Sequence, residues 1–135
     1  MRKKKRVVVF GIFDGIHDGH RDLFRQAKEQ GQELVVIVGR DSASLKWKGK
    51  KPVHPEEERL SLVLKERYID NALLGDEEQS SYGVLEELHP DVVCVGYDQD
   101  TLFKDLEQWI KNKSIQLIRL KPYHSEIYHN AKLRA

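Results

Sequence analysis

The stretch VVVFGIFDGIHDGH, residues 7–20, decides the fold. Its first four residues form a continuous apolar and mostly β-branched run, which is typical of a strand buried on both faces in a parallel sheet covered by helices. A polar segment with glycines follows, and apolar side chains then recur at helical spacing from about Asp18 to Gln30. The stretch therefore predicts a buried strand, a tight loop and a helix in succession.

Two further apolar runs, 34–39 and 91–96, predict two more buried strands. Shorter strands are expected at 69–74 and 115–120, the last at an edge, and the further helices are predicted to begin at Pro55 and to span 82–88 and 101–111. Right-handed crossovers convert this alternation into an α/β fold. We expect a three-layer, doubly wound, Rossmann-like, five-stranded parallel sheet of order 3-2-1-4-5, with ligands at the carboxyl ends of the first and fourth strands.

Length and composition bound the class of protein. The 135 residues, 39% of them hydrophobic, predict one domain, 1–135, with a disordered basic start at 1–5 and an irregular tail at 121–135. A net charge of +1 disfavours a general nucleic-acid or membrane-surface binder, and the basic start is interpreted as a solvated terminus rather than an RNA site. The single cysteine, Cys94, excludes a disulfide framework and a cysteine zinc site. We expect a cytoplasmic protein without a membrane segment.

The loop at 11–20 carries the chemistry. Gly11 and Gly15 permit tight turns and close approach of a ligand, and the unpaired amides of the following helix start predict an anion site. His17 and His20 lie three apart at this helix start, so both imidazoles can donate hydrogen bonds to one phosphate. Two such histidines can also be ordinary surface residues or half of a metal site. The glycines, the buried strand and the helix favour the phosphate site.

The same residues resemble a known signature. Residues 11–20 are similar to the G-x-F-D-x-x-H-x-G-H motif of the cytidylyltransferase-like nucleotidyltransferases, and the resemblance covers nearly the whole chain. It is strongest to enzymes of the glycerol-3-phosphate cytidylyltransferase and archaeal-type FAD synthetase kind. The resemblance implies that His17 and His20 contact the triphosphate and stabilise the transition state. Nucleotide-binding residues are also expected in the motif, at Gly11, Ile12, Phe13, Asp14 and Gly19.

Two further basic residues are candidates by the same resemblance. Lys46, or failing that Lys48, matches a family lysine that reaches the phosphates; both belong to a basic segment predicted as a loop, and a solvated loop is the alternative. Arg59 matches an arginine that helps to shape the active site. Its alternative is a surface pair with Glu56, three residues earlier on a helix.

The segment after the fourth strand resembles the family's G-x-D segment, which borders the base and the ribose. This implies nucleotide binding by Gly96, Asp98 and Gln99. An ordinary helix cap by Asp98 or Asp100 is the alternative, and the two roles are compatible.

The tail departs from the family pattern. Residues 128–133 take the place of a late I-S-T-T-K-I motif whose hydroxyls bind the triphosphate, and they retain Lys132 but none of the hydroxyl residues. Asn130 and Lys132 are the remaining candidates for nucleotide binding there.

The sequence thus predicts a nucleotidyltransferase. It would move a nucleoside monophosphate from CTP or ATP to a phosphate-bearing small molecule, such as FMN or glycerol 3-phosphate, with release of pyrophosphate. Mg²⁺ is expected to ride on the nucleotide phosphates, without protein metal ligands. The resemblance also implies a homodimer. The altered tail motivates one alternative, a non-catalytic nucleotide-binding module of the same fold.

Overall fold

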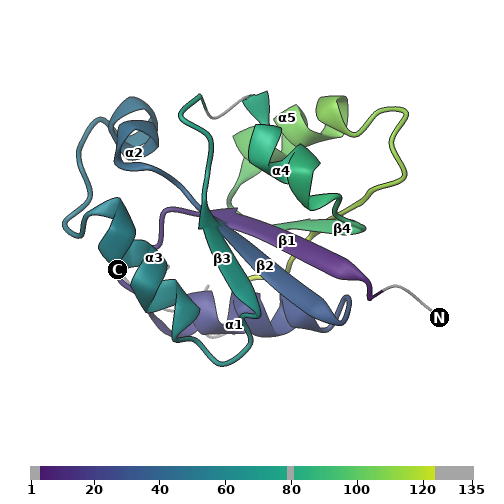
Figure 1. The fold of residues 1–135 in the computed structure, drawn as a ribbon, viewed down its shortest axis with the longest axis horizontal. Helices are drawn as coiled ribbons and strands as arrows, with labels where there is room; N and C mark the ends of the chain where they lie inside the picture. Colours follow the sequence, from purple (N-terminus) through teal and green to yellow (C-terminus); the bar gives the residue numbers. More distant parts are fainter. Residues whose placement is uncertain (1–3, 79–80, 124–135) are drawn as a thin grey trace, which may run out of the picture.

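The computed structural model describes residues 4–78 and 81–123, and five parallel strands form its centre (Figure 1). The strands are β1 (Arg6–Gly11), β2 (Glu33–Val38), β3 (Asn71–Leu74), β4 (Val92–Val95) and β5 (Gln116–Arg119). The helices are α1 (Asp18–Lys28), α2 (Asp41–Lys48), α3 (Glu56–Leu64), α4 (Gly83–Leu88) and α5 (Asp100–Trp109). The strand order β3-β2-β1-β4-β5 is the predicted one.

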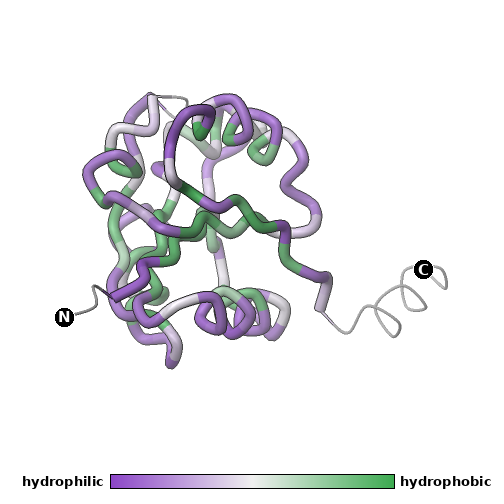
Figure 2. The backbone as a smooth tube through the Cα atoms, turned by 90° about the vertical axis from the view of Figure 1, so that its right-hand side faces the viewer, coloured by the Kyte–Doolittle hydropathy of each residue, from purple (hydrophilic) through white to green (hydrophobic). Residues whose placement is uncertain are grey.

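The sheet is the middle of three layers. Alternate residues of β1 face opposite sides: Val7 and Val9 pack with Phe24 of α1, whereas Val8 packs with Leu85 of α4. Helices α1 and α3 therefore cover one face of the sheet, and α4 and α5 cover the other (Figure 1). Coloured by hydropathy, the backbone tube is mostly hydrophobic along the strands in the middle and largely hydrophilic along the segments around them (Figure 2). Burial on both faces explains why the long strands are continuous apolar runs.

Register follows from the parallel pairing of the central strands. Val8 in β1 lies opposite Val35 in β2 and Val93 in β4, so three fully buried valines form one row across the sheet. At the amino end, the guanidinium of Arg6 pairs with Glu33 at 2.7 Å, while its backbone N–H donates to the carboxylate of Asp91 at 2.8 Å. These contacts align the carboxyl ends of the strands at the opposite edge.

One helix was not predicted. Residues 41–48 were expected to be part of a basic loop, yet they form α2, which ends at Gly49 in the left-handed region at φ 73°. Sequence periodicity gave no signal, because among the described side chains of this helix the buried ones are the small Ala43 and Ser44, while Leu45 stays 49% exposed. The other elements agree with the predictions to within about two residues at their ends, and β5 lies at the edge as expected.

Glycines mark the carboxyl edge of the sheet. Gly11 ends β1, while Gly39, Gly75 and Gly96 directly follow β2, β3 and β4. A Cβ on Gly39 would lie 2.5 Å from the side chain of Ile12, and one on Gly11 would lie 2.4 Å from the ring of Phe13. The loop after β1 can therefore fold down onto the strand ends only because these positions lack side chains. In the described part of the chain, no helix has both the length and the apolar character that a membrane crossing requires.

Candidate active site

A cleft of about 800 Å³ lies over the carboxyl ends of the strands. Its walls come from the loop after β1 and from the segments that follow β2, β3 and β4, and it is closed on one side by the start of α5 and by residues 121 and 123. This is the switch point at which the chain order reverses on either side of β1. The sequence predicted a ligand site at this edge, and the geometry agrees with that prediction.

His17 and His20 stand at the N-terminus of α1 and line this cleft. The Nδ1 atom of His17 accepts a hydrogen bond from the backbone N–H of Gly19 at 3.0 Å, and Nδ1 of His20 accepts one from the N–H of His17 at 3.3 Å. The two rings stack with their centroids 3.8 Å apart and their planes 22° from parallel. Because each Nδ1 is an acceptor, the proton of each neutral imidazole is on Nε2, which is a hydrogen-bond donor.

Close packing below the rings fixes their position. Phe13 makes an edge-on contact with His20 and a tilted contact with Phe24, each with centroids 5.2 Å apart. The backbone of Phe13 is in the left-handed region, at φ 54°, which turns its ring under the strand end. A Cβ on Gly19 would lie 2.8 Å from Cε1 of His17, so the ring of His17 occupies the space that any other residue at position 19 would fill.

The predicted role of the loop amides needs a correction. We expected unpaired N–H groups at the start of this helix, but those of His17 and Gly19 are bound to imidazole nitrogens in a reciprocal cap. The capping box satisfies the orphan amides with ring acceptors instead of with a ligand. The imidazole Nε2–H groups and the helix dipole can therefore still attract an anion to this helix end.

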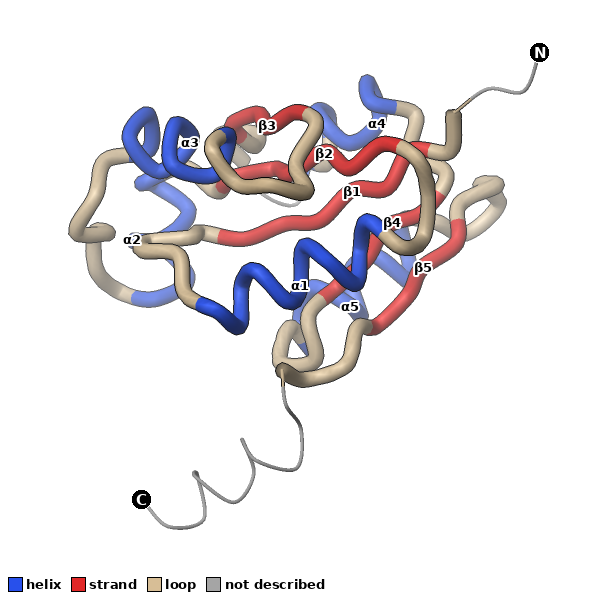
Figure 3. Tube along the Cα trace, turned by 90° about the horizontal axis from the view of Figure 1, so that it is seen from below, coloured by secondary structure: helices blue, strands red, loops and turns tan. Residues whose placement is uncertain are grey.

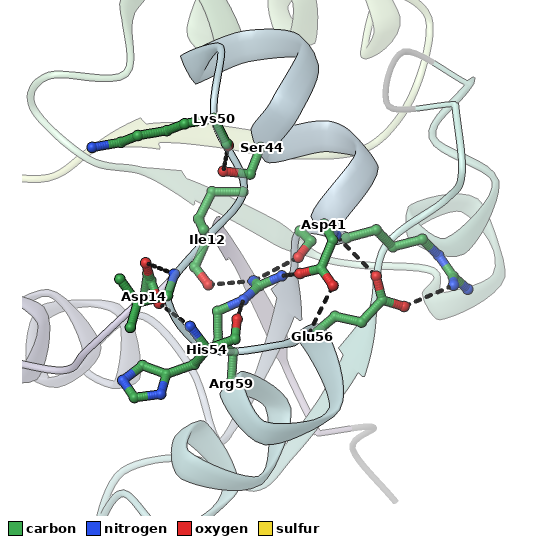
Figure 4. Close-up of polar contacts among 11 residues, drawn as sticks. Ile12, Asp14, Asp41, Ser44, Lys50, His54, Glu56 and Arg59 are labelled. Carbon is green, nitrogen blue, oxygen red and sulfur yellow. Dashed lines mark hydrogen bonds and ion pairs between the residues drawn. The ribbon is translucent and has the colours of Figure 1, made fainter.

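Asp14 belongs to the motif but does not line the cleft. Its carboxylate accepts hydrogen bonds from the backbone N–H groups of Val53, at 2.7 Å, and His54, at 2.9 Å (Figure 4). These two bonds, the one from His54 first, lower the pKa of Asp14 below its ordinary value of 3.8. These bonds tie the loop after β1 to the segment that precedes α3, and a contact of Asp14 with the nucleotide stays a prediction.

Arg59 on α3 is fully buried, so the alternative of a surface pair with Glu56 is wrong. Its guanidinium donates at 2.7 Å to the carbonyl groups of Ile12 and Gly39 and to the carboxylate of Asp41, and at 3.0 Å to the carbonyl of His54 (Figure 4). Arg59 has no exposed surface in this conformation, so it acts on the site through the segments that it binds, in line with the expected role in shaping the active site. It positions the end of β2 and the loop after β1.

Two helix starts beside Arg59 cap each other. The carboxylate of Glu56 accepts from the backbone N–H of Asp41 at 2.9 Å, and the carboxylate of Asp41 accepts from the N–H of Glu56 at 3.4 Å. Neither α2 nor α3 has a cap from its own preceding residue. Acidic residues in the first turn therefore stabilise both helices through their dipoles and hold α2 beside the cleft.

Lys46 is not brought to the cleft. It lies on α2 with an exposed side chain and is absent from the cleft wall. The fallback residue, Lys48, is on the same helix. A role of either lysine at the phosphates stays a prediction.

Gly96, Asp98 and Gln99 all line the cleft, as expected. The side chain of Gln99 bridges two strand ends, since its Oε1 accepts from the N–H of Gly96 at 2.7 Å and its Nε2 donates to the carbonyl of Phe10 at 3.3 Å. Gln99 also precedes α5, which has no side-chain cap, so the alternative of a cap by Asp98 or Asp100 is wrong. Asp98 remains exposed at the cleft and available to a polar ligand.

Several residues of the cleft wall were missed from the sequence, among them Arg40, Asp76, Lys121 and Tyr123. Arg40 and Asp76 each follow a glycine at the end of a strand, and this strand-glycine-charge pattern could have revealed them. The segment at 121–123 carries no comparable signal. The predicted residues Asn130 and Lys132 lie outside the residues that the structure describes.

The described carboxylates that line the cleft do not form a cluster that could bind a metal ion directly. The described residues contain no group of three histidine, cysteine or acidic side chains that could hold an ion. Asp18, Asp76 and Asp98 line the cleft; Asp18 pairs with Arg21, and Asp76 accepts from the backbone N–H of Val84. Such single carboxylates fit a hydrated Mg²⁺ that is carried by substrate phosphates.

Comparisons with known proteins agree with this geometry. The model of the cytidylyltransferase-like family matches residues 8–132. A protein named FAD synthase from Pyrococcus horikoshii is 41% identical over 123 residues, which are 90% of this chain and 82% of the relative. Another FAD synthase, from Thermococcus sibiricus, is 34% identical over 135 residues, with 98% and 91% of the two chains covered.

A solved structure shares both the fold and part of the sequence. The lipopolysaccharide core biosynthesis protein from Thermoplasma volcanium superposes with a TM-score of 0.78 at 33% identity, over 90% of this chain and 99% of that one. Family match, relatives and fold thus agree with the paired histidines at the switch point. The chain belongs to the cytidylyltransferase-like family and is a nucleotidyltransferase.

Proposed function

We propose that the protein transfers AMP from ATP to FMN, which forms FAD and releases pyrophosphate. The stacked pair of His17 and His20 in the cleft carries this proposal, because it offers two Nε2–H donors at the N-terminus of a helix. The relatives named FAD synthase support ATP and FMN as the substrates, at 41% and 34% identity over most of their length.

The reaction needs no protein nucleophile. A phosphate oxygen of FMN attacks the α-phosphorus of ATP, the bond from that phosphorus to the bridging oxygen of the β-phosphate breaks, and pyrophosphate leaves with the bond electrons. The second pKa of a phosphate monoester is about 6, so the attacking oxygen is largely anionic at neutral pH. Catalysis then consists of positioning and charge stabilisation.

The two imidazoles supply that stabilisation. Donors held rigidly in a water-poor cleft act more strongly on developing charge than donors in bulk water, because they need no reorganisation. The Nδ1 hydrogen bonds and the contact with Phe13 hold the rings in place before substrate arrives. Mg²⁺ would neutralise part of the phosphate charge, and Asp18, Asp76 and Asp98 are the carboxylates at hand to hold its water shell.

The walls of the cleft favour a flavin over glycerol 3-phosphate as the acceptor. Phe10, Ile37 and Ala43 contribute apolar surface on the β2 side. An isoalloxazine ring gains from apolar surface, whereas glycerol, which is small and polar, does not. On the other side of β1, the exposed Asp98 can accept hydrogen bonds from ribose hydroxyls.

The test is a product assay. Purified protein with Mg²⁺ is supplied with ATP or CTP, and with FMN or glycerol 3-phosphate, and pyrophosphate and FAD are quantified. Among these substrate pairs, we expect turnover only with ATP and FMN, which form FAD and pyrophosphate. Turnover with CTP and glycerol 3-phosphate only would refute the substrates, and tight nucleotide binding without any turnover would support the alternative of a binding module.

Histidine variants make the assay specific. His17→Ala and His20→Ala should each lower kcat by about 100-fold or more, in the range of lost oxyanion donors, with much smaller effects on ATP affinity. His89→Asn serves as the matched control, because His89 lies beyond the far end of α4, outside the cleft, and asparagine tolerates its left-handed backbone.

A further inference from the structure

The chain that leaves β5 is fastened to α1 by one glutamine. Oε1 of Gln26 accepts from the backbone N–H of Lys121 at 2.9 Å, and Nε2 of Gln26 donates to the carbonyl of Lys121 at 2.8 Å. The same Nε2 donates to the carboxylate of Asp22 at 2.8 Å. The amide oxygen and both amide hydrogens are thus used, which fixes the orientation of the side chain. The side-chain amide of Gln26 therefore binds both the N–H and the carbonyl of Lys121, as a neighbouring β-strand would.

This fastening places Lys121 beside the histidine motif. Lys121 and Tyr123 both line the cleft, and Cβ of Tyr123 lies 3.9 Å from the point where a Cβ on Gly19 would be. Figure 3 shows the chain beyond β5 passing close to α1, in agreement with the two hydrogen bonds between Gln26 and Lys121. Lys121 therefore approaches the cleft from the β5 side, opposite to the side on which Arg40 follows β2.

Charge distinguishes the two cations of the wall. The guanidinium of Arg40 is engaged, since it donates to the carbonyl of Gly75 at 2.7 Å and pairs with Glu56 at 3.3 Å. Within residues 4–78 and 81–123, the ammonium of Lys121 has no carboxylate at ion-pair distance. An uncompensated cation beside a cleft attracts the most highly charged ligand most strongly.

We propose that Lys121 binds the β- and γ-phosphates of the nucleotide, the part that leaves as pyrophosphate, and that Gln26 positions it. The inference rests on the proposed function, in which a triphosphate is the substrate with the largest charge. A lysine acts on phosphates as a mobile point charge, so its exposed ammonium can follow pyrophosphate as it departs. The tail at 128–133 lacks the hydroxyl residues that bind the triphosphate in the family motif. The positive charge of Lys121 would attract the phosphates in their place.

The first experiment measures binding without turnover. MgATP and pyrophosphate are titrated, each in the absence of FMN, into the wild-type protein and into Lys121→Ala, Lys121→Arg and Lys111→Ala. Lys111, exposed beyond the end of α5, is a control of equal charge change away from the cleft. We expect about 10-fold weaker binding of both probes to Lys121→Ala, near wild-type binding to Lys121→Arg and no change in Lys111→Ala. The effect should shrink as salt is raised.

Kinetics then separate the triphosphate from the acceptor phosphate. The KM for ATP should rise about 10-fold in Lys121→Ala while the KM for FMN stays within twofold. Unchanged affinity for ATP and pyrophosphate, or a loss confined to the KM for FMN, would overturn the proposal. Because the pyrophosphate titration needs no product, a wild-type protein that forms no FAD would refute the proposed function and still leave Lys121 open to test.

The role of Gln26 is tested through Lys121. Gln26→Ala should weaken MgATP binding in the wild-type background and have no further effect in Lys121→Ala, because residues that act as a unit are not additive. The melting temperature of each variant is also measured, to show whether the substitution has impaired folding. An equal effect of Gln26→Ala in both backgrounds would show that the glutamine does not act by positioning the lysine.

Discussion

Gly19→Ala should separate stability from catalysis. An alanine Cβ at position 19 would lie 2.8 Å from Cε1 and 3.0 Å from Nδ1 of His17, whereas ordinary contacts begin at 3.4 Å, so the ring must move by about 0.6 Å. Stacking on His20, 3.8 Å away, leaves the ring little room to move without disturbing its partner. A misplacement of about 1 Å can cost about 100-fold in rate. We therefore expect kcat to fall about 10- to 100-fold.

The same change should not destabilise the protein strongly. Alanine is preferred to glycine inside a helix by about 0.5–1 kcal/mol, which offsets the loss of the hydrogen bond between Gly19 and His17. Urea unfolding and a steady-state FAD assay on the same preparation measure both quantities. Gly19→Ala in a His17→Ala background should cause little further loss of kcat. A kcat within twofold of wild type would refute the claim that Gly19 exists to make room for the ring.

Three further predictions concern the framework. Arg59→Ala should lower the free energy of unfolding by about 2–3 kcal/mol, because the carbonyl groups that accept hydrogen bonds from the buried guanidinium would lose their donor. A loss below about 1 kcal/mol in urea unfolding would contradict this role. The pKa of Asp14 is lowered by amides of His54 and Val53, so its stabilisation is present above pH 3.8 and is lost as pH falls through the lower folded-state pKa. Asp14→Asn should therefore show a smaller drop in Tm between pH 6 and pH 3 than the wild type, and equal drops would argue against it. Burial raises the pKa of Cys94 to about 12, so this single thiol should resist a thiol reagent at pH 8 until urea unfolds the protein, and rapid labelling of the folded protein would contradict that burial.

Much of the fold could be predicted because its signals are local. The run at Val7–Val9, like its counterparts in β2 and β4, is apolar on both faces, and this pattern alone identifies a covered parallel sheet. The helix that begins at Asp18 also follows from neighbouring residues, whereas the capping by the side chains of His17 and His20 was not predicted. Helix α2 lacks such a signal, since its position depends on Asp41 and Glu56, which are distant in sequence and cap each other's helices.

The sequence by itself determined the strand order and the place of the cleft, because both follow from the alternation of strands and helices and from right-handed crossovers. It also determined the histidine pair, because the two residues lie within one helical turn. Only the tertiary structure decided what the remaining polar groups do. Asp14 and Gln99 were predicted to bind the nucleotide and Arg59 to shape the active site. In the structure each of the three also binds backbone groups of a segment distant in sequence. A polar group binds whichever partner the fold brings within hydrogen-bond distance, and for the backbone of Lys121 that partner, Gln26, is 95 residues away in the sequence.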